Sequence, residues 1–330
     1  MKSASQSNRV TIAPREALDA IRRAQSLSRG ESTAKSERGG AATLDPAKSA
    51  RVSAREVLRE EATRVRDGIA VAADDARSMT DRLEGIHRAR RGLKRLHALR
   101  DLLRCGFERG EPAARNSIRR AKARLAETRH HDALALLLEE LCALRGRPLT
   151  SDALHQRAAA HIELQADALR EVFADVACAE RSMRVVAGAP LDWHEITDAA
   201  ARSWERARRC ARQQWLGRTE SWLHQTRKHF QRLCDQLAAL ALCTTESQVS
   251  TRKRLRLAAE QLGRARDLEM LCDMIDRATP EGRAVAKHAL RLRARAVREA
   301  RDLSRKALVA TSAQMRHAMR ARISAERSHG

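Results

Sequence analysis

A repeat separated by 137 residues is the feature that most restricts how this chain can fold. Shifting the sequence by that distance aligns residues 86–104 with residues 223–241 without a gap, and the register continues as far as Leu134 and Leu271. About eleven of about 48 aligned positions are identical, where this skewed composition would give roughly four by chance. The basic identities are His87/His224, Arg90/Arg227, Arg95/Arg232, Arg115/Arg252, Arg119/Arg256 and Arg129/Arg266. The most repeated property of the chain is therefore its placement of positive charge.

The residue types throughout the chain favour helices. Ala, Leu and Arg, which are strong helix formers, are abundant, and runs of β-branched residues are nearly missing. Aromatic residues make up only 2% of the chain and Tyr is absent, so the core must consist of aliphatic side chains. We expect an all-α protein with roughly eight helices. Breaks are expected near residues 74–81, 105–112, 145–152, 187–193, 243–248 and 278–283.

The domain organisation follows from the strongest break. Residues 187–193 lie near the middle of a helical region at 51–325, which predicts one half at 51–188 and a second at 189–325. Residues 1–50 are rich in Ser, Gly, Ala and charge, and we expect a basic, disordered tail there.

Membrane and secretory roles are not expected. No apolar run approaches the roughly 18 residues of a membrane span, and the N-terminus lacks the hydrophobic segment of a secretory signal. The seven Cys are spread without a CxxC pair, so we expect buried free thiols in the cytoplasm.

On a helix, each repeated segment has an apolar arc beside a basic arc. The apolar arcs are Leu93, Leu96 and Leu103 in the first copy and Phe230, Leu233 and Leu240 in the second. The basic arcs are His87, Arg90, Arg91, Lys94 and His97, and then His224, Arg227 and Lys228. The following segments carry further basic stripes, at Arg115, Arg119, Lys122 and Arg129, and at Arg252, Arg256 and Arg266. We expect the apolar arcs to form the core and the basic residues to line a groove.

The charge implies a polyanionic partner. A net charge of +23 and a pI near 11.1 suit nucleic acid, an acidic membrane surface or a phosphate polymer. Arg matches phosphate oxygens with paired donors, Lys supplies a point charge, and His can become protonated beside phosphate. A single Arg is usually no more than a solvated surface residue. A His–Arg–Arg set that is repeated at one spacing instead favours the binding of a polyanion.

The repeated spacing H-x2-R-x4-R occurs as HRARRGLKR from His87 and as HQTRKHFQR from His224, and LGRARDLEML follows from Leu262. These stretches resemble the CHAD domain, a conserved-histidine α-helical domain, over roughly residues 51–325. The resemblance implies two pseudo-symmetric four-helix bundles with a basic channel between them that binds inorganic polyphosphate. The residues that it implies as ligands are His87, Arg90, Lys94, Arg95, Arg129, His224, Arg227, Lys228, Arg232 and Arg266. The basic stripes add Arg119 and Arg256.

Two positions depart from the pattern of that family. Gln231 stands where the second half would carry Lys, and RHHD at 129–132 stands where the first half would carry Arg-Asp. Both departures affect the ligand geometry more than the fold.

The expected function is that of a non-enzymatic polyphosphate-binding protein of cytoplasmic polyphosphate granules, with no cofactor and other granule proteins as possible partners. The alternative is a nucleoid-type protein that binds nucleic acid non-specifically, although no recognition-helix module or aromatic RNA platform is visible. The stretch HHD at 130–132 suggests a metal phosphohydrolase, because His and Asp on a helix can bind a divalent metal ion. The spacing of the other His and Asp residues, however, selects no further metal ligands. Trp193, Trp204, Trp215 and Trp222 are expected to pack in a core or interface rather than to stack on bases.

Overall fold

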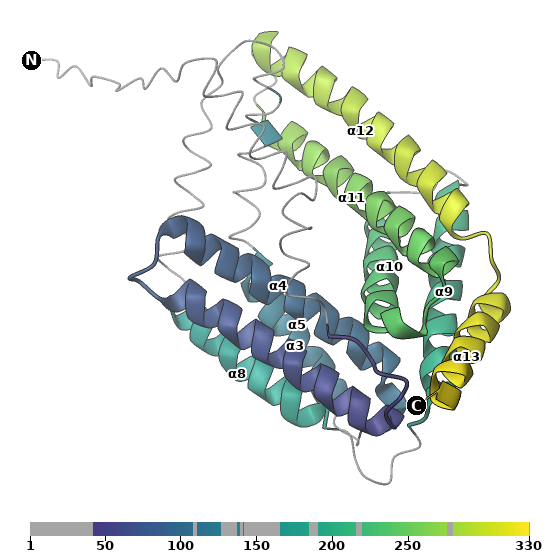
Figure 1. The fold of residues 1–330 in the computed structure, drawn as a ribbon. Coiled ribbons are helices and arrows are strands. Elements are labelled where there is room, and N and C mark those ends of the chain that lie inside the picture. Colours follow the sequence, from purple (N-terminus) through teal and green to yellow (C-terminus); the bar gives the residue numbers. More distant parts are fainter. Residues whose placement is uncertain are drawn as a thin grey trace, which may run out of the picture.

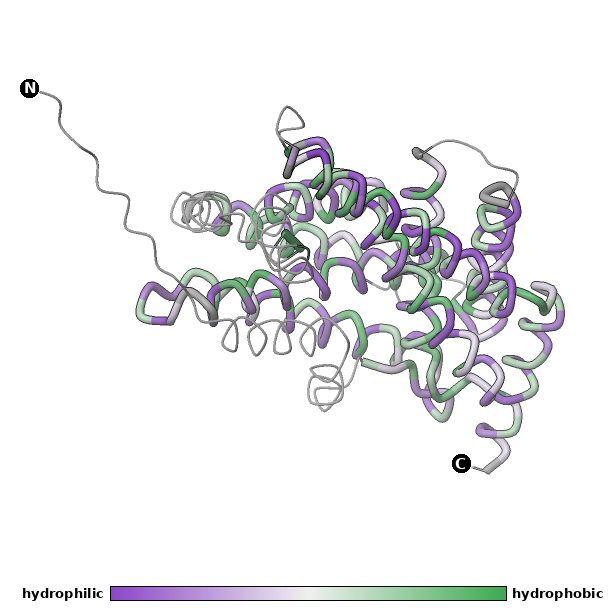
Figure 2. The backbone as a smooth tube through the Cα atoms, turned by 90° about the horizontal axis from the view of Figure 1, so that it is seen from above, coloured by the Kyte–Doolittle hydropathy of each residue, from purple (hydrophilic) through white to green (hydrophobic). Residues whose placement is uncertain are grey.

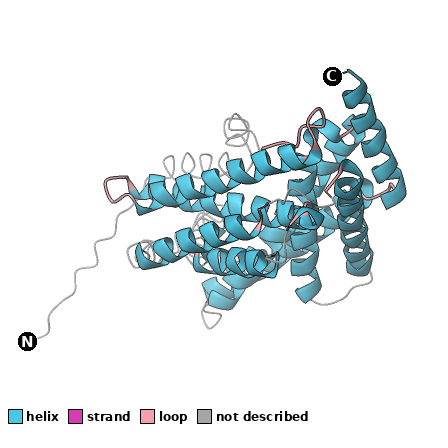
Figure 3. Ribbon diagram, turned by 90° about the horizontal axis from the view of Figure 1, so that it is seen from below, coloured by secondary structure: helices cyan, strands magenta, loops and turns pink. Residues whose placement is uncertain are grey.

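A computed structural model describes residues 42–107, 111–126, 137–138, 141, 166–184, 191–215, 220–275 and 280–329. These residues form nine α-helices and two short 3₁₀ helices, and no strand occurs among them (Figures 1 and 3). The expectation of an all-α protein is confirmed for this part of the chain. None of its helices is long and apolar enough to cross a membrane.

The first four helices pack together. They are α3 (Ala50–Ala73), α4 (Met79–Leu102), α5 (Glu111–Arg124) and α8 (Ala166–Ser182). Helix α3 packs against α4 and α8, and α5 packs against α8 and α4. Figure 1 shows these helices running side by side.

The remaining helices are α9 (Trp193–Trp215), α10 (Glu220–Ala239), α11 (Glu246–Met274), α12 (Pro280–Ala307) and α13 (Ser312–His329). Helix α10 packs between α9 and α11, while α12 lies along α11 and α13 lies against α9. Helix α10 also packs against α4, which joins the two sets of helices.

The repeat reappears in the local structure. Helix α4 is followed by the 3₁₀ helix η1 (Arg104–Gly106), and α10 is followed by the 3₁₀ helix η2 (Ala241–Cys243). The two 3₁₀ helices are 137 residues apart, which is the spacing of the repeat. The N–H of Gly106 donates to the carbonyl of Leu103 at 2.9 Å, and the N–H of Cys243 donates to the carbonyl of Leu240 at 2.8 Å. Matching residues therefore make the same turn.

Several helices begin where the sequence predicts a break. The hydroxyl of Ser78 accepts the N–H of Asp81 at 3.2 Å and opens α4. Thr245 and Gln248 form a reciprocal capping box at the start of α11, and α12 begins at Pro280. The break expected at 145–152 lies outside the described residues.

The apolar arcs form the core, as predicted. The six side chains of these arcs are all at most 1% exposed: Leu93, Leu96, Leu103, Phe230, Leu233 and Leu240. Figure 2 shows the resulting mixture of hydrophobic and hydrophilic positions along each helix. Trp193 and Trp204 are buried, which confirms their packing role, and the described cysteines are free thiols.

The predicted limit of the tail is wrong at its C-terminal end. Leu44 is fully buried, and its N–H donates to the carbonyl of Ala239 at 2.6 Å at the end of α10. The hydroxyl of Ser53 accepts the N–H of Asp45 at 2.7 Å. Residues 42–50 therefore belong to the fold because they cap a helix end and fill the core beside it. Residues 1–41 lie outside the described part, and α13 continues past residue 325 to His329.

Candidate polyanion-binding site

The site is built on the contact between α4 and α10. The amide of Gln236 on α10 donates to the carbonyl of Ala98 on α4 at 3.2 Å. One turn away, Nη1 of Arg232 lies 2.8 Å from Oδ2 of Asp101, in an ion pair whose side chains are 24% and 11% exposed. Burial would raise the pKa of Asp101, but the charge of Arg232 and the hydrogen bond from Arg100 outweigh it and lower the pKa. This carboxylate therefore stays ionised and holds the two helices together.

Six basic residues from four helices come close together around this contact. We call them the cation cluster: Arg90, Arg119, Lys122, Lys228, Arg232 and Arg266. Lys122 on α5 is half-buried, and its pKa is lowered by burial and then by the charges of Arg232 and Lys228. Arg90 on α4 acts on Lys122 in the same direction.

Lys228 shows that the cluster extends to α11. Its pKa is lowered by burial and then by Arg266, Arg232 and Arg119. Within the described residues, no carboxylate forms an ion pair with Lys122 or Lys228. Helices α4, α5, α10 and α11 thus bring positive charges together, and the acids beside them, Asp101 at Arg232 and Asp235 at Lys122, compensate only part of that charge.

Two matched arginines lie against the helix that follows their own. Arg90 donates through Nη1 to the carbonyl of Leu125, just after α5. Arg227 lies so close to Gly263 on α11 that a Cβ at that position would be 2.9 Å from the guanidinium carbon. The missing side chain at Gly263 therefore makes room for Arg227.

His224 and His97 are neutral near pH 7 in the unbound protein. Nη1 of Arg266 donates a hydrogen bond to Nδ1 of His224 at 2.7 Å. Burial, followed by the charges of Lys228 and Arg266, lowers the pKa of His224 to about 4. Burial and Arg232 lower the pKa of His97 to about 3. The protonation of His224 beside a bound phosphate stays a prediction, because the lowered pKa of this residue belongs to the protein without an anion. His87 is a half-buried residue of α4.

Three acidic residues at the site were missed by the sequence reasoning. Glu61 on α3 is 1% exposed, and its Oε1 lies 2.7 Å from Arg64 and 3.5 Å from Arg95. Asp101 bonds to Arg232 as described above. Asp235 on α10 is buried enough for its pKa to rise to about 6, although Arg95 and Lys94 act in the opposite direction. A sequence signal was available for Asp235, which is the only acid of α10 after its first residue, whereas α3 and α4 each contain several acids and nothing in their sequences singles out Glu61 or Asp101.

The structure places the predicted site residues in different surroundings. Arg90, Arg119, Lys228, Arg232 and Arg266 lie in the cation cluster, where they are joined by Lys122, which was not among the predicted ligands. His224 and Arg227 adjoin Lys228, and Lys94 and Arg95 adjoin Asp235.

Arg256 differs from these residues. It is exposed, and its Nε lies 3.2 Å from Glu260 on its own helix. Arg129 and the HHD stretch lie outside the described residues. Within the described ranges, no group of three or more His, Cys, Asp or Glu is arranged to hold a metal ion.

Comparison of the chain with family models, with curated proteins and with solved structures returns no match.

Proposed function

We propose that this protein binds inorganic polyphosphate at the cation cluster and acts as a binding protein rather than as an enzyme. The observation that carries the proposal is the gathering of six basic side chains from four helices around the contact between α4 and α10, close enough for their charges to add to the effect of burial in lowering the pKa of Lys122 and of Lys228. Positive charges held this close repel one another, and an anion that lies between them removes the repulsion. A linear phosphate polymer can contact several of them at once.

We further propose that the helices form two pseudo-symmetric four-helix bundles with the cation cluster in a basic channel between them. The recurrence of the same 3₁₀ turn after α4 and α10 supports the symmetry. The contact between α4 and α10 supports a channel at the junction, because the repeated basic residues lie on these two helices and on the helices that follow them.

Binding at this site would be electrostatic. Each phosphate unit carries about one negative charge, and neutralising several units releases their counterions, by analogy with nucleic acids. Arg side chains would hold phosphate oxygens with paired donors, while Lys122 and Lys228 would act as point charges. We place the protein at cytoplasmic polyphosphate granules, where it would meet this polymer and other granule proteins.

The first experiment removes four of the six residues of the cation cluster and keeps Arg232, which pairs with Asp101, and Arg90, which donates to the carbonyl of Leu125. The variant replaces Arg119, Lys122, Lys228 and Arg266 with Gln. The control variant replaces four basic residues on other faces: Arg59, Arg209, Lys253 and Arg298. Both lose four positive charges, so overall charge is matched. We expect the cluster variant to bind long-chain polyphosphate at least about 50-fold more weakly than the wild type. The affinity of the control variant should fall less than about threefold. Both affinities are measured by filter retention at physiological salt. Equal losses would reject the assigned site.

The second experiment separates polyphosphate from nucleic acid. Labelled polyphosphate is bound to the protein, and duplex DNA is added as competitor at equal phosphate concentration and physiological salt. We expect most of the polyphosphate to stay bound. Displacement by DNA would instead support the nucleic-acid alternative, and release of orthophosphate on incubation with divalent metal would support an enzyme.

A further inference from the structure

The positive charge around the contact between α4 and α10 continues beyond the cation cluster. Burial lowers the pKa of Arg232, and Arg206 and Arg115 are among the nearby cations that act in the same direction. Burial, followed by the charges of Arg232 and Arg206, also lowers the pKa of His229 on α10. Arg115 lies on α5 and Arg206 on α9, so α9 is a fifth helix that brings a cation to this place.

The packing of α9 fixes the face on which Arg206 lies. Trp204, two residues earlier, is 1% exposed, and its indole N–H donates to the carbonyl of Ala310 at 3.0 Å. Residues two apart on a helix are separated by about 200° around its axis, so they lie on nearly opposite faces. Arg206 is exposed on the face turned away from Trp204, while α9 packs against both α10 and α4. A well-packed helix therefore holds Arg206 beside the site.

Neither of the two added arginines is neutralised by an acid of the described residues. Arg115 and Arg206 are both exposed, and neither forms an ion pair or a hydrogen bond with another described residue. Asp101, the acid beside Arg232, already pairs with that residue and with Arg100. This carboxylate cannot compensate all of these cations, so an excess of positive charge is left that a polyanion would neutralise.

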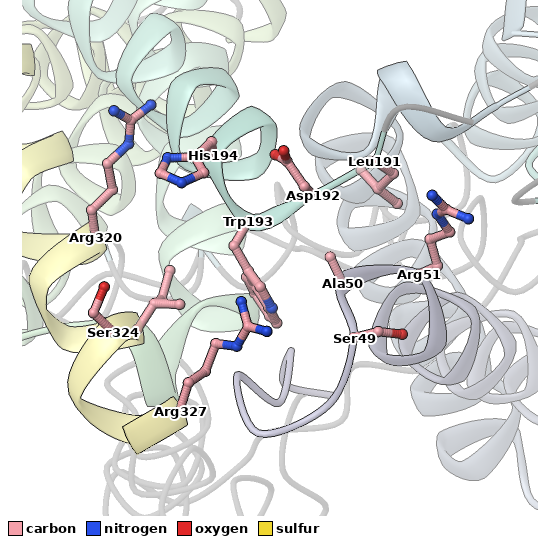
Figure 4. Close-up of a pocket in the computed structure, with 11 residues that line it drawn as sticks. Ser49, Ala50, Arg51, Leu191, Asp192, Trp193, His194, Arg320, Ser324 and Arg327 are labelled. Carbon is pink, nitrogen blue, oxygen red and sulfur yellow. The ribbon is translucent and has the colours of Figure 1, made fainter. Parts of the chain in front are cut away.

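The basic residues at the start of α9 are arranged differently. A pocket of roughly 430 Å³ lies there, and Figure 4 shows three arginines on different sides of it: Arg51, Arg320 and Arg327. Nη2 of Arg320 lies 3.0 Å from Oδ1 of Asp198, so this cation is already paired. The pocket therefore lacks the gathered and uncompensated charge that is found beside Arg232.

The cations of the extended site lie on both neighbours of α10. Helix α10 packs between α9 and α11, and Arg266 on α11 lies close to Lys228. Arg206 on α9 lies close to Arg232, which is one turn further along α10. A ligand that contacts both Arg266 and Arg206 has to cross α10, and the axes of packed helices are about 8–10 Å apart. An extended polymer meets this requirement better than a short oligomer does.

We propose that a long phosphate polymer continues past Arg232 to Arg115 on α5 and Arg206 on α9, and that this extension makes the protein prefer long chains to short ones. The inference rests on the proposed function, because it extends the same site. A longer chain neutralises two further cations and releases more counterions, so its affinity is higher. The position 137 residues before Arg206 is Ile69, so the contribution of α9 is not part of the repeat.

The experiment compares long-chain polyphosphate with tripolyphosphate by isothermal titration calorimetry of the full-length protein at physiological salt. One variant replaces Arg115 and Arg206 with Gln, and the control variant replaces Arg59 and Arg298 with Gln. We expect the Arg115/Arg206 variant to bind the long chain at least about tenfold more weakly than the wild type, and tripolyphosphate less than about twofold more weakly. The control variant should change less than about twofold with either ligand.

A further variant separates the extension from the proposed function. The Arg119/Lys122/Lys228/Arg266 variant should lose affinity for both ligands, because the cation cluster holds short and long chains alike. If the Arg115/Arg206 variant binds the long chain as tightly as the wild type while the cluster variant does not, the extension is overturned and the cluster stands. Equal losses of the two ligands in the Arg115/Arg206 variant would overturn the length preference. Full binding by the cluster variant would reject the proposed function itself.

Discussion

Arg95 and Arg232 occupy matched positions of the repeat, yet they bond to acids in different parts of the molecule. Arg95 on α4 reaches Glu61 on α3, the helix before its own, at 3.5 Å. Arg232 on α10 crosses to Asp101 on α4 at 2.8 Å. The repeat places Ala238 opposite Asp101, so this acid has no counterpart in the second copy. Repetition thus sets where the cations lie, while unrepeated acids decide which of them stabilise the fold.

The largest effect should come from the acid that joins the two copies. Asp101→Asn removes the charge that holds Arg232 and Arg100, whose side chains are 24% and 8% exposed. Breaking one partner of a buried ion pair leaves the other charge uncompensated and costs about 3 kcal/mol. We expect urea denaturation to show a loss of that size in the free energy of unfolding.

The same variant also tests the ligand. A bound polyanion would replace the missing carboxylate charge, so saturating polyphosphate should stabilise Asp101→Asn more than it stabilises the wild type. Asp67→Asn, a change at an exposed acid on α3, is the control and should cost less than about 0.5 kcal/mol. A loss below about 1 kcal/mol in Asp101→Asn would show that Asp101 does not hold α4 to α10.

A smaller loss in the free energy of unfolding is expected when Glu61, the acid that pairs with Arg95 of the first copy, is replaced. Glu61→Gln removes the charge that Arg64 and Arg95 share, and Arg95 is 32% exposed, so water can solvate it in place of Glu61. We therefore expect a loss of about 2 kcal/mol in the free energy of unfolding. A larger loss than in Asp101→Asn would reverse the comparison between the two copies.

A pH effect should arise at Asp235, which the repeat pairs with Ala98. Burial raises the pKa of Asp235 to about 6, and its charge acts on Lys94 and Arg95. As the pH falls through 6 this carboxylate is protonated, the net positive charge beside these cations increases, and polyanion binding strengthens. We expect about threefold tighter polyphosphate binding at pH 5.5 than at pH 7.5.

Asp235→Asn should bind at pH 7.5 about as tightly as the wild type binds at pH 5.5, and its pH dependence over this range should be flatter. The pKa of His224 is about 4, so this histidine contributes little over the same range in the unbound protein. An unchanged pH profile in Asp235→Asn would assign the effect to another group.

The smallest effects distinguish the matched pair Arg119 and Arg256. Arg119 lies close enough to Lys228 to lower its pKa, whereas Arg256 pairs with Glu260 on an exposed face. We expect Arg119→Gln to weaken polyphosphate binding about threefold and Arg256→Gln to leave it unchanged within about 1.5-fold. Fluorescence titration of the two single variants is sufficient, and equal effects would show that the two copies contribute equally.

The sequence was sufficient for the properties that depend on helical periodicity. Period and composition predicted the all-α fold, the buried arcs containing Leu93 and Phe230, and the basic arcs on α4 and α10. These are local properties, because each residue's face on a helix follows from its position in the same helix.

The sequence was insufficient wherever two distant segments meet. Asp101 and Asp235 lie at the contact between α4 and α10, and no periodicity indicates how those helices cross. Leu44 lies in a segment of tail-like composition, yet it is buried at the end of α10. The role of Lys122 in the cluster likewise depends on α5 lying near α10, although its place on a basic stripe was visible.

The central claim is that cations from both copies bind one polyanion together, and the salt dependence of polyphosphate affinity tests it most directly. The slope of log affinity against log salt reports the number of charges neutralised, at about 0.7 per charge for a flexible single strand. The Arg119/Lys122/Lys228/Arg266 variant should have a slope shallower by about 3 than the wild type, with the slope of the Arg59/Arg209/Lys253/Arg298 control unchanged. Equal slopes in all three proteins would contradict a shared site.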